Sequence, residues 1–308
     1  MTDNRPSVKK NTCVAIVAPS SYVPDDLALD RGIAALEARG CRVKNYSAQG
    51  EKCQRFAATD AQRAAQLHAA ARDPDVQIVL ALRGGYGMSR LMHLLDFKVL
   101  ANSGKLFVGH SDFTAFQMAL LKQHGTISFC GPMLSIDFTR DDPSDFTQDD
   151  FWQCLTAPEH TIVGKSDAHS AIDVSGTLWG GNLSILTHLV GTPYLPKIDG
   201  GILFVEDISE HPYRIERMLL QLLHAGILAR QKAILLGDFS NYSLSEYDNG
   251  YDFAAMVSYI RSQLTVPVLT GLPFGHIRDK VTLPVGAQAR LQSDGEDFQL
   301  SMRDYPVL

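Results

Sequence analysis

The stretch Leu106-Phe107-Val108-Gly109-His110-Ser111-Asp112-Phe113-Thr114 decides how this chain folds and where its chemistry lies. Its first three residues form an apolar run typical of a buried strand, whereas residues 113–122 have the pattern of a helix. Ser111 therefore lies in a tight turn between a strand and a helix. Sites in α/β sheets form beyond the carboxyl ends of the strands, so this turn is a candidate site.

The first half of the chain repeats this alternation of strand and helix. Strands are predicted over 13–18, 43–46, 77–82 and 106–108, and helices over 27–39, 60–72 and 113–122. Such alternation indicates a parallel sheet with helices on its faces. We therefore predict an N-terminal α/β domain over residues 1–135 that contains the Ser111 turn.

The second half of the chain has a different pattern. Periodicity weakens over residues 136–174, where aspartates crowd around Pro143, and this segment is predicted to be a linker with a short helix near 151–155. Residues 175–308 contain many short β-like runs, more glycine and proline, and two clear helices. The expected fold class is thus α/β, with an N-terminal parallel-sheet domain that carries the nucleophile and a C-terminal β-rich domain.

Composition excludes several classes of protein. The 308 residues are 45% hydrophobic and 20% charged, as in ordinary globular proteins. A net charge of -6 without a Lys/Arg cluster does not fit a nucleic-acid partner. A polar start without an apolar signal core, and no apolar run long enough for a bilayer, favour a cytoplasmic protein without a membrane partner. The five scattered cysteines form no CxxC pair and suggest neither disulfides nor a zinc site.

Two other polar residues follow apolar runs in the way that Ser111 does. Glu206 closes the run 201–205, and His276 follows Phe274-Gly275. A serine, a carboxylate and a histidine are the parts of a catalytic triad, which is defined by geometry and roles rather than by chain order. The hypothesis is that Ser111 is the nucleophile, His276 the base and Glu206 the carboxylate that orients the base.

Each assignment has an alternative. Ser111 is also a good helix N-cap, and Phe113 occupies the second glycine position of the GxSxG turn, which argues against the α/β-hydrolase superfamily. The histidines that compete with His276 are His110, expected to pack or contact substrate, and His211. Glu210 and Glu216 are expected to serve the following helix instead of the site.

The glycine-rich run Gly84-Gly85-Tyr86-Gly87 directly follows a predicted strand. Glycines let backbone N–H groups approach a ligand closely, and an oxyanion hole needs two such donors. The N–H groups of Gly85 and Asp112 are the predicted pair. Because no nucleotide-binding glycine motif and no HExxH spacing occur, neither a cofactor nor a metal is expected.

These motifs together resemble the LD-carboxypeptidases, a family of serine peptidases, along almost the full length of the chain. The matching stretches lie at 17–20, 83–87, 109–114, 131–133, 176–183, 191–193, 206–208, 212–219 and 275–276. The family's serine, glutamate and histidine fall on Ser111, Glu206 and His276. The resemblance implies that the second domain supplies Glu206 and His276, and that the protein is commonly a homodimer.

The resemblance also implies a reaction. The expected activity is release of the terminal D-alanine from the murein tetrapeptide L-Ala-γ-D-Glu-meso-DAP-D-Ala, on cell-wall fragments recycled in the cytoplasm. The alternatives are the same machinery acting on another amide, as in microcin self-immunity, or a non-catalytic binding protein for small peptides or sugars. Two questions stay open: whether Trp179-Gly180-Gly181-Asn182 lines the cleft or supports packing, and whether Arg83 or Arg278 meets the substrate carboxylate.

Overall fold

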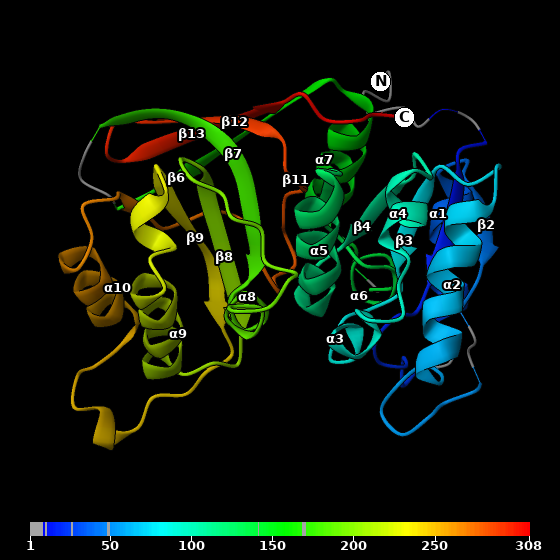
Figure 1. Cartoon of the computed structure of the whole chain (residues 1–308), viewed down its shortest axis with the longest axis horizontal. Coiled ribbons are helices and arrows are strands. Elements are labelled where there is room, and N and C mark those ends of the chain that lie inside the picture. Colours follow the sequence, from blue (N-terminus) through cyan, green and yellow to red (C-terminus); the bar gives the residue numbers. More distant parts are fainter. Residues whose placement is uncertain (1–8, 10, 26, 48–49, 141, 168–170) are drawn as a thin grey trace.

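The chain folds around two sheets that lie side by side (Figure 1). The computed structural model describes residues 9, 11–25, 27–47, 50–140, 142–167 and 171–308. The first sheet has six strands in the order β11-β5-β4-β3-β1-β2, and the second has seven in the order β10-β9-β8-β7-β12-β13-β6. This arrangement confirms the predicted α/β class with a parallel sheet followed by a β-rich half.

The first sheet is built from the strands that alternate with helices in the sequence. Its strands are β1 (Cys13–Val17), β2 (Arg42–Asn45), β3 (Ile78–Ala81), β4 (Leu106–Gly109) and β5 (Ser128–Cys130), all parallel, and β11 (Leu283–Val285), antiparallel to β5. All residues of β1, β3 and β4 are buried. Continuous apolar runs are expected in such central strands because both faces of a parallel sheet are covered.

Helices cover this sheet in layers. They are α1 (Leu27–Ala38), α2 (Asp60–Arg72), α3 (Met88–Leu91), α4 (Phe97–Ala101), the 3-10 turn η1 (Ser111–Phe113), α5 (Thr114–His124) and α6 (Leu134–Asp137). In one layer α2 packs on α4 and α4 on α5, whereas α1 packs on α6. Figure 1 shows α5 between the two sheets. No helix formed by the described residues is both long and apolar enough to cross a membrane.

The second sheet has a parallel part and an antiparallel part. Its strands are β6 (Glu159–Lys165), β7 (Ile172–Asn182), β8 (Ile202–Ile208), β9 (Ala233–Ser240), β10 (Val268–Leu269), β12 (Gln288–Ser293) and β13 (Asp297–Arg303). The long strand β7 pairs with β12 antiparallel at its start and with β8 parallel at its end. The helical elements that follow β7 in the chain are α8 (Leu183–His188), α9 (Pro212–His224), η2 (Leu228–Arg230), η3 (Glu246–Asp248) and α10 (Phe253–Ser262).

The segment 136–174 contains more regular structure than the predicted linker. It holds α7 (Asp145–Thr156), longer than the expected short helix, and β6, which pairs with β13 at the edge of the second sheet. Alternate residues of β6, His160 and Ile162, are buried, so the strand has one inward face. Its partner lies more than 130 residues further along the chain, and local periodicity cannot reveal such a pairing. The domain boundaries at 135 and 175 stay a prediction.

Gly180 provides a test of how tightly β7 packs on β8. A Cβ on Gly180 would lie 1.8 Å from the Phe204 carbonyl oxygen, and its φ is +141°. Gly191 also has a positive φ, +82°, but no atom lies within 4 Å of its Cβ position. Gly180→Ala should therefore cost about 3 kcal/mol in overpacking and backbone strain, against about 1 kcal/mol for Gly191→Ala. Urea unfolding of both variants measures the difference, and equal costs would contradict close packing at Gly180.

Candidate active site

Ser111 occupies a strained turn directly after β4. Its φ is +62°, a left-handed conformation that non-glycine residues rarely adopt. A Cβ on Gly84 would lie 2.8 Å from the Ser111 Cβ, so the turn packs closely on the loop that follows β3. Strained backbone at a strand-to-helix turn is how serine hydrolases present a nucleophile.

The three residues of the predicted triad form a continuous chain of hydrogen bonds. The Ser111 Oγ lies 3.1 Å from His276 Nε2, and His276 Nδ1 lies 2.7 Å from Glu206 Oε2. An ionised carboxylate can only accept a hydrogen bond, so His276 Nδ1 carries the hydrogen and donates to Glu206 Oε2. The lone pair of Nε2 then faces the Ser111 hydroxyl, as a general base requires.

Glu206 and His276 reach Ser111 from the second half of the chain, and their local structure differs from expectation. β8 does not end at Glu206 but continues to Ile208, with a β-bulge between Val205 and Asp207. A bulge re-aims side chains next to active sites. His276 lies in the loop between β10 and β11 and not directly after a strand; the Asp238 N–H donates to the Phe274 carbonyl (2.8 Å) and ties this loop to β9.

The electrostatic environment suits a base. Glu206 is fully buried, and the His276 side chain is 13% exposed. Burial alone lowers the pKa of His276, but the hydrogen bond and the negative charge of Glu206 outweigh it, so the pKa lies above its ordinary value. The imidazolium that forms when His276 takes a proton is therefore stabilised.

The competing histidines and the nearby glutamates have other partners in the structure. His110 is fully buried, with its Nδ1 2.8 Å from the Gly131 carbonyl oxygen, and its ring packs edge-on against His276 at 5.1 Å. His211 caps α9 and pairs with Asp248. As for the carboxylates, Glu210 pairs with Arg214 and Glu216 accepts from Tyr251, so both are engaged near α9 and not with His276.

Of the two predicted oxyanion donors, Asp112 directly follows Ser111 in the chain, and Gly85 follows Gly84, whose Cβ position lies 2.8 Å from the Ser111 Cβ. The Gly85 and Asp112 N–H groups have no acceptor among the described residues. The Asp112 side chain has a role that the sequence does not indicate. Its carboxylate accepts from Ser20 Oγ (2.9 Å) and from the Met88 N–H (3.1 Å), and burial raises its pKa. It thereby joins the segments that follow β1, β3 and β4.

The structure shows the contacts of the Trp179-Gly180-Gly181-Asn182 segment and of the two candidate arginines, Arg83 and Arg278. Trp179 is buried and its Nε1 donates to Gln231 Oε1 (2.9 Å), which is a packing role, whereas Asn182 contacts the triad carboxylate. Arg278 is paired with Asp142 and Asp279 near the surface. Arg83, partly buried, donates to the Tyr22 carbonyl.

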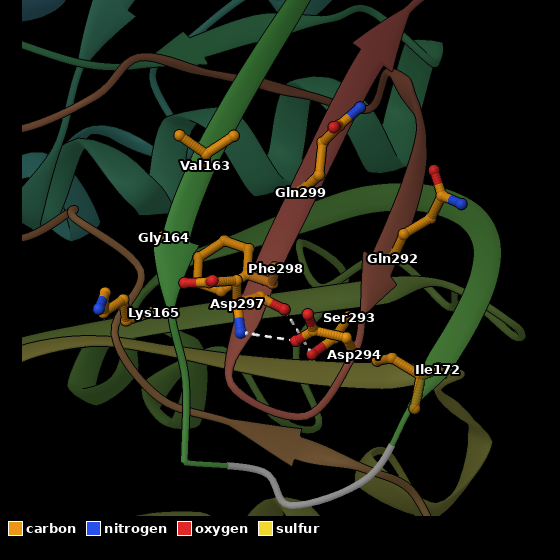
Figure 2. Close-up of a pocket in the computed structure, with 10 residues that line it drawn as sticks. All are labelled: Val163, Gly164, Lys165, Ile172, Gln292, Ser293, Asp294, Asp297, Phe298 and Gln299. Atoms are coloured by element: carbon orange, nitrogen blue, oxygen red, sulfur yellow. Dashed lines mark hydrogen bonds between the residues drawn. The ribbon is translucent and has the colours of Figure 1, made fainter.

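A separate hollow lies outside this site. It is an open depression of about 820 Å³ on β6, β12 and β13, shown in Figure 2. Its lining residues are Val163, Gly164, Lys165, Ile172, Gln292, Ser293, Asp294, Asp297, Phe298 and Gln299. Among the residues that the structure describes, this lining contains no histidine or cysteine. Across the described ranges, no three His, Cys, Asp or Glu side chains gather as a metal site would require.

An α/β fold that joins a strained serine to a histidine and a buried glutamate defines a serine hydrolase. Comparison with known proteins agrees. Residues 14–131 match the LD-carboxypeptidase N-terminal domain, and residues 175–291 match the LD-carboxypeptidase C-terminal domain. The chain belongs to the LD-carboxypeptidase family and is a serine-type carboxypeptidase.

Individual relatives share most of the chain. A probable murein peptide carboxypeptidase of Bacillus subtilis is 33% identical over 290 residues, covering 93% of this chain and 91% of that protein. The crystal structure of muramoyltetrapeptide carboxypeptidase from Oxalobacter formigenes has 58% identity and a TM-score of 0.93, covering 96% of this chain and all of that one. The microcin C7 self-immunity protein of Escherichia coli is 24% identical over 302 residues, covering 88% of this chain and 87% of that protein.

The pH dependence of the reaction tests the Glu206–His276 contact. Glu206 raises the His276 pKa, so Glu206→Gln should lower it, and the acid limb of kcat/KM should move to lower pH. The plateau should fall at least about 100-fold, because the carboxamide no longer stabilises the imidazolium. Glu210→Gln is the matched control and should keep the wild-type profile. An acid limb that stays in place in Glu206→Gln would rule out the charge effect.

Proposed function

We propose that this enzyme releases the terminal D-alanine from the murein tetrapeptide L-Ala-γ-D-Glu-meso-DAP-D-Ala. The observation that carries the proposal is the hydrogen-bonded chain from Ser111 through His276 to the buried Glu206. The names of the Bacillus and Oxalobacter relatives support a murein peptide substrate.

In the first half of the proposed reaction, Ser111 Oγ attacks the carbonyl carbon of the bond between the L-centre of the diamino acid and D-Ala. His276 Nε2 takes the hydroxyl proton, while Glu206 holds the ring and stabilises its positive charge. The oxygen of the tetrahedral intermediate accepts from the N–H groups of Gly85 and Asp112. These donors cost no reorganisation, because the turns that hold them are already formed.

In the second half, His276 gives its proton to the leaving amine of D-Ala, and an acyl-enzyme remains on Ser111. A water molecule then gives its proton to His276 Nε2 and attacks the ester carbonyl. Collapse of this intermediate returns the proton to Ser111 Oγ and releases the tripeptide.

The setting of the reaction is part of the proposal. We place the enzyme in the cytoplasm, acting as a homodimer on cell-wall fragments during peptidoglycan recycling. All five cysteines are free, which supports a reducing compartment. The homodimer rests on the family resemblance, and light scattering of the purified protein measures it.

The substrate and the nucleophile can be tested together. Purified enzyme should release D-alanine from the tetrapeptide, measured by mass spectrometry, and should leave the all-L counterpart intact.

Ser111→Ala should abolish release of D-alanine, and His276→Ala should be nearly as inactive. Glu206→Ala should fall between Ser111→Ala and the wild type, because nucleophile and base persist without the orienting carboxylate. Activity of Ser111→Ala within tenfold of wild type would remove Ser111 from the mechanism. Hydrolysis of a microcin-type amide without D-alanine release would favour the other function.

Chelation tests the metal-free mechanism. Each step above uses side chains and backbone donors of this chain, so EDTA should leave the rate of D-alanine release unchanged. The measurement is the rate before and after dialysis against EDTA, with and without added zinc. A loss that zinc restores would contradict the serine mechanism.

A further inference from the structure

Asn182 is the last residue of β7 and lies directly beside Glu206 in the parallel pairing of β7 with β8. Its side chain is buried, so its polar atoms depend on protein partners. Its Nδ2 donates to Glu206 Oε1 (3.2 Å) and to Asp207 Oδ1 (3.0 Å). Glu206 thus has one oxygen on the Asn182 amide and the other on His276.

The orientation of this amide is fixed by its other end. Asn182 Oδ1 lies 3.2 Å from the backbone nitrogen of Ile185, and a backbone N–H can only donate. The Ser184 hydroxyl donates to the same oxygen (2.7 Å). The oxygen therefore caps α8, and both Nδ2 hydrogens face carboxylates.

Glu206 and Asp207 are adjacent buried carboxylates that need such a donor. Burial, followed by the charge of Glu206, raises the pKa of Asp207 to about 6. Asp207 also accepts from the Ser184 N–H (2.9 Å). An amide that donates to both carboxylates reduces their repulsion and fixes the angle between them.

The backbone of Asn182 contacts the segment that holds the nucleophile. The Asn182 N–H donates to Thr114 Oγ1 (3.0 Å), and Thr114 begins α5, three residues after Ser111. A Cβ on Gly181 would lie 2.5 Å from this oxygen, so the approach requires glycine there. One residue therefore touches both the carboxylate of the triad and the helix that follows the nucleophile.

We propose that Asn182 is a positioning residue. Its side-chain amide holds Glu206 in line with His276, and its backbone N–H, bonded to Thr114, fixes the position of this carboxylate relative to the Ser111 turn. The proposal rests on the orienting role of Glu206 in the proposed function. It places the Trp179-Gly180-Gly181-Asn182 segment in two roles, since Trp179 packs the core and Asn182 supports the chemistry.

Substitution of Asn182 separates positioning from helix capping. Asn182→Ser keeps an oxygen that can cap α8 but lacks the amide donor. We expect kcat to fall about 10- to 100-fold, as for loss of a hydrogen bond to a charged group, with KM changed less than threefold. Asp252→Ala, which removes the cap of the distant helix α10, should lower the melting temperature without lowering kcat.

A double-mutant cycle tests whether Asn182 acts through Glu206. In the Glu206→Ala background, Asn182→Ser should reduce the residual kcat less than twofold, because the carboxylate it positions is gone. An equal loss in both backgrounds, or a kcat of Asn182→Ser within twofold of wild type, would overturn the proposal. If Glu206→Ala itself turned over at the wild-type rate, the triad assignment would be wrong instead.

Thr114 provides a second route if Asn182→Ser does not fold. Thr114→Val removes the oxygen that accepts from the Asn182 N–H and should lower kcat with little change in KM. Thr114→Ser keeps that oxygen and should lose clearly less than Thr114→Val. Equal losses in the two variants would show that the contact does not serve catalysis.

Discussion

The structure depends on the burial of one carboxylate. Glu206 has no exposure to solvent, and a buried charge is tolerated only where protein groups pair with it. Its two oxygens meet His276 and Asn182, so the loop that carries His276 and the end of β7 must both reach the bulge of β8. The end of β7, the bulge of β8 and the His276 loop therefore meet at Glu206. Without the hydrogen bonds to His276 and Asn182, the carboxylate of Glu206 would be a buried charge with no partner.

A site shared between two sheets also requires that the sheets keep their relative position. After His276 the chain returns to the first sheet, where β11 pairs with β5. Between these points Lys280 forms a buried ion pair with Asp137 (2.8 Å) at the end of α6. Breaking a buried pair by removing one partner is strongly destabilising, so this contact opposes separation. The loop that carries His276 is thus attached to the first sheet in two ways. The chain continues from it into β11, and Lys280 forms the ion pair with Asp137.

The sequence was sufficient for features that depend on nearby residues. The strands β1 to β4 and the helices α1, α2 and α5 follow from apolar runs and 3.6-residue periodicity, whereas the short helices α3 and α4 were not predicted. The residue types of the predicted triad stand out because each follows an apolar stretch. The amide of Asn182 could not be assigned, because its contacts require the pairing of strands that are 24 residues apart. The bulge at Glu206, the strand β6 and the Asp112 carboxylate likewise depend on partners that no local pattern indicates.

The conformation of Ser111 sets function against stability at a single position. A residue with a φ of +62° is tolerated there only because the surrounding turn holds it, and glycine would adopt the same backbone without the Cβ conflict. The proposed nucleophile is thus a strained point of the native state. Replacement of Ser111 by glycine would remove the reactive hydroxyl and the backbone strain together, so stability and the proposed chemistry make opposite demands on this one residue.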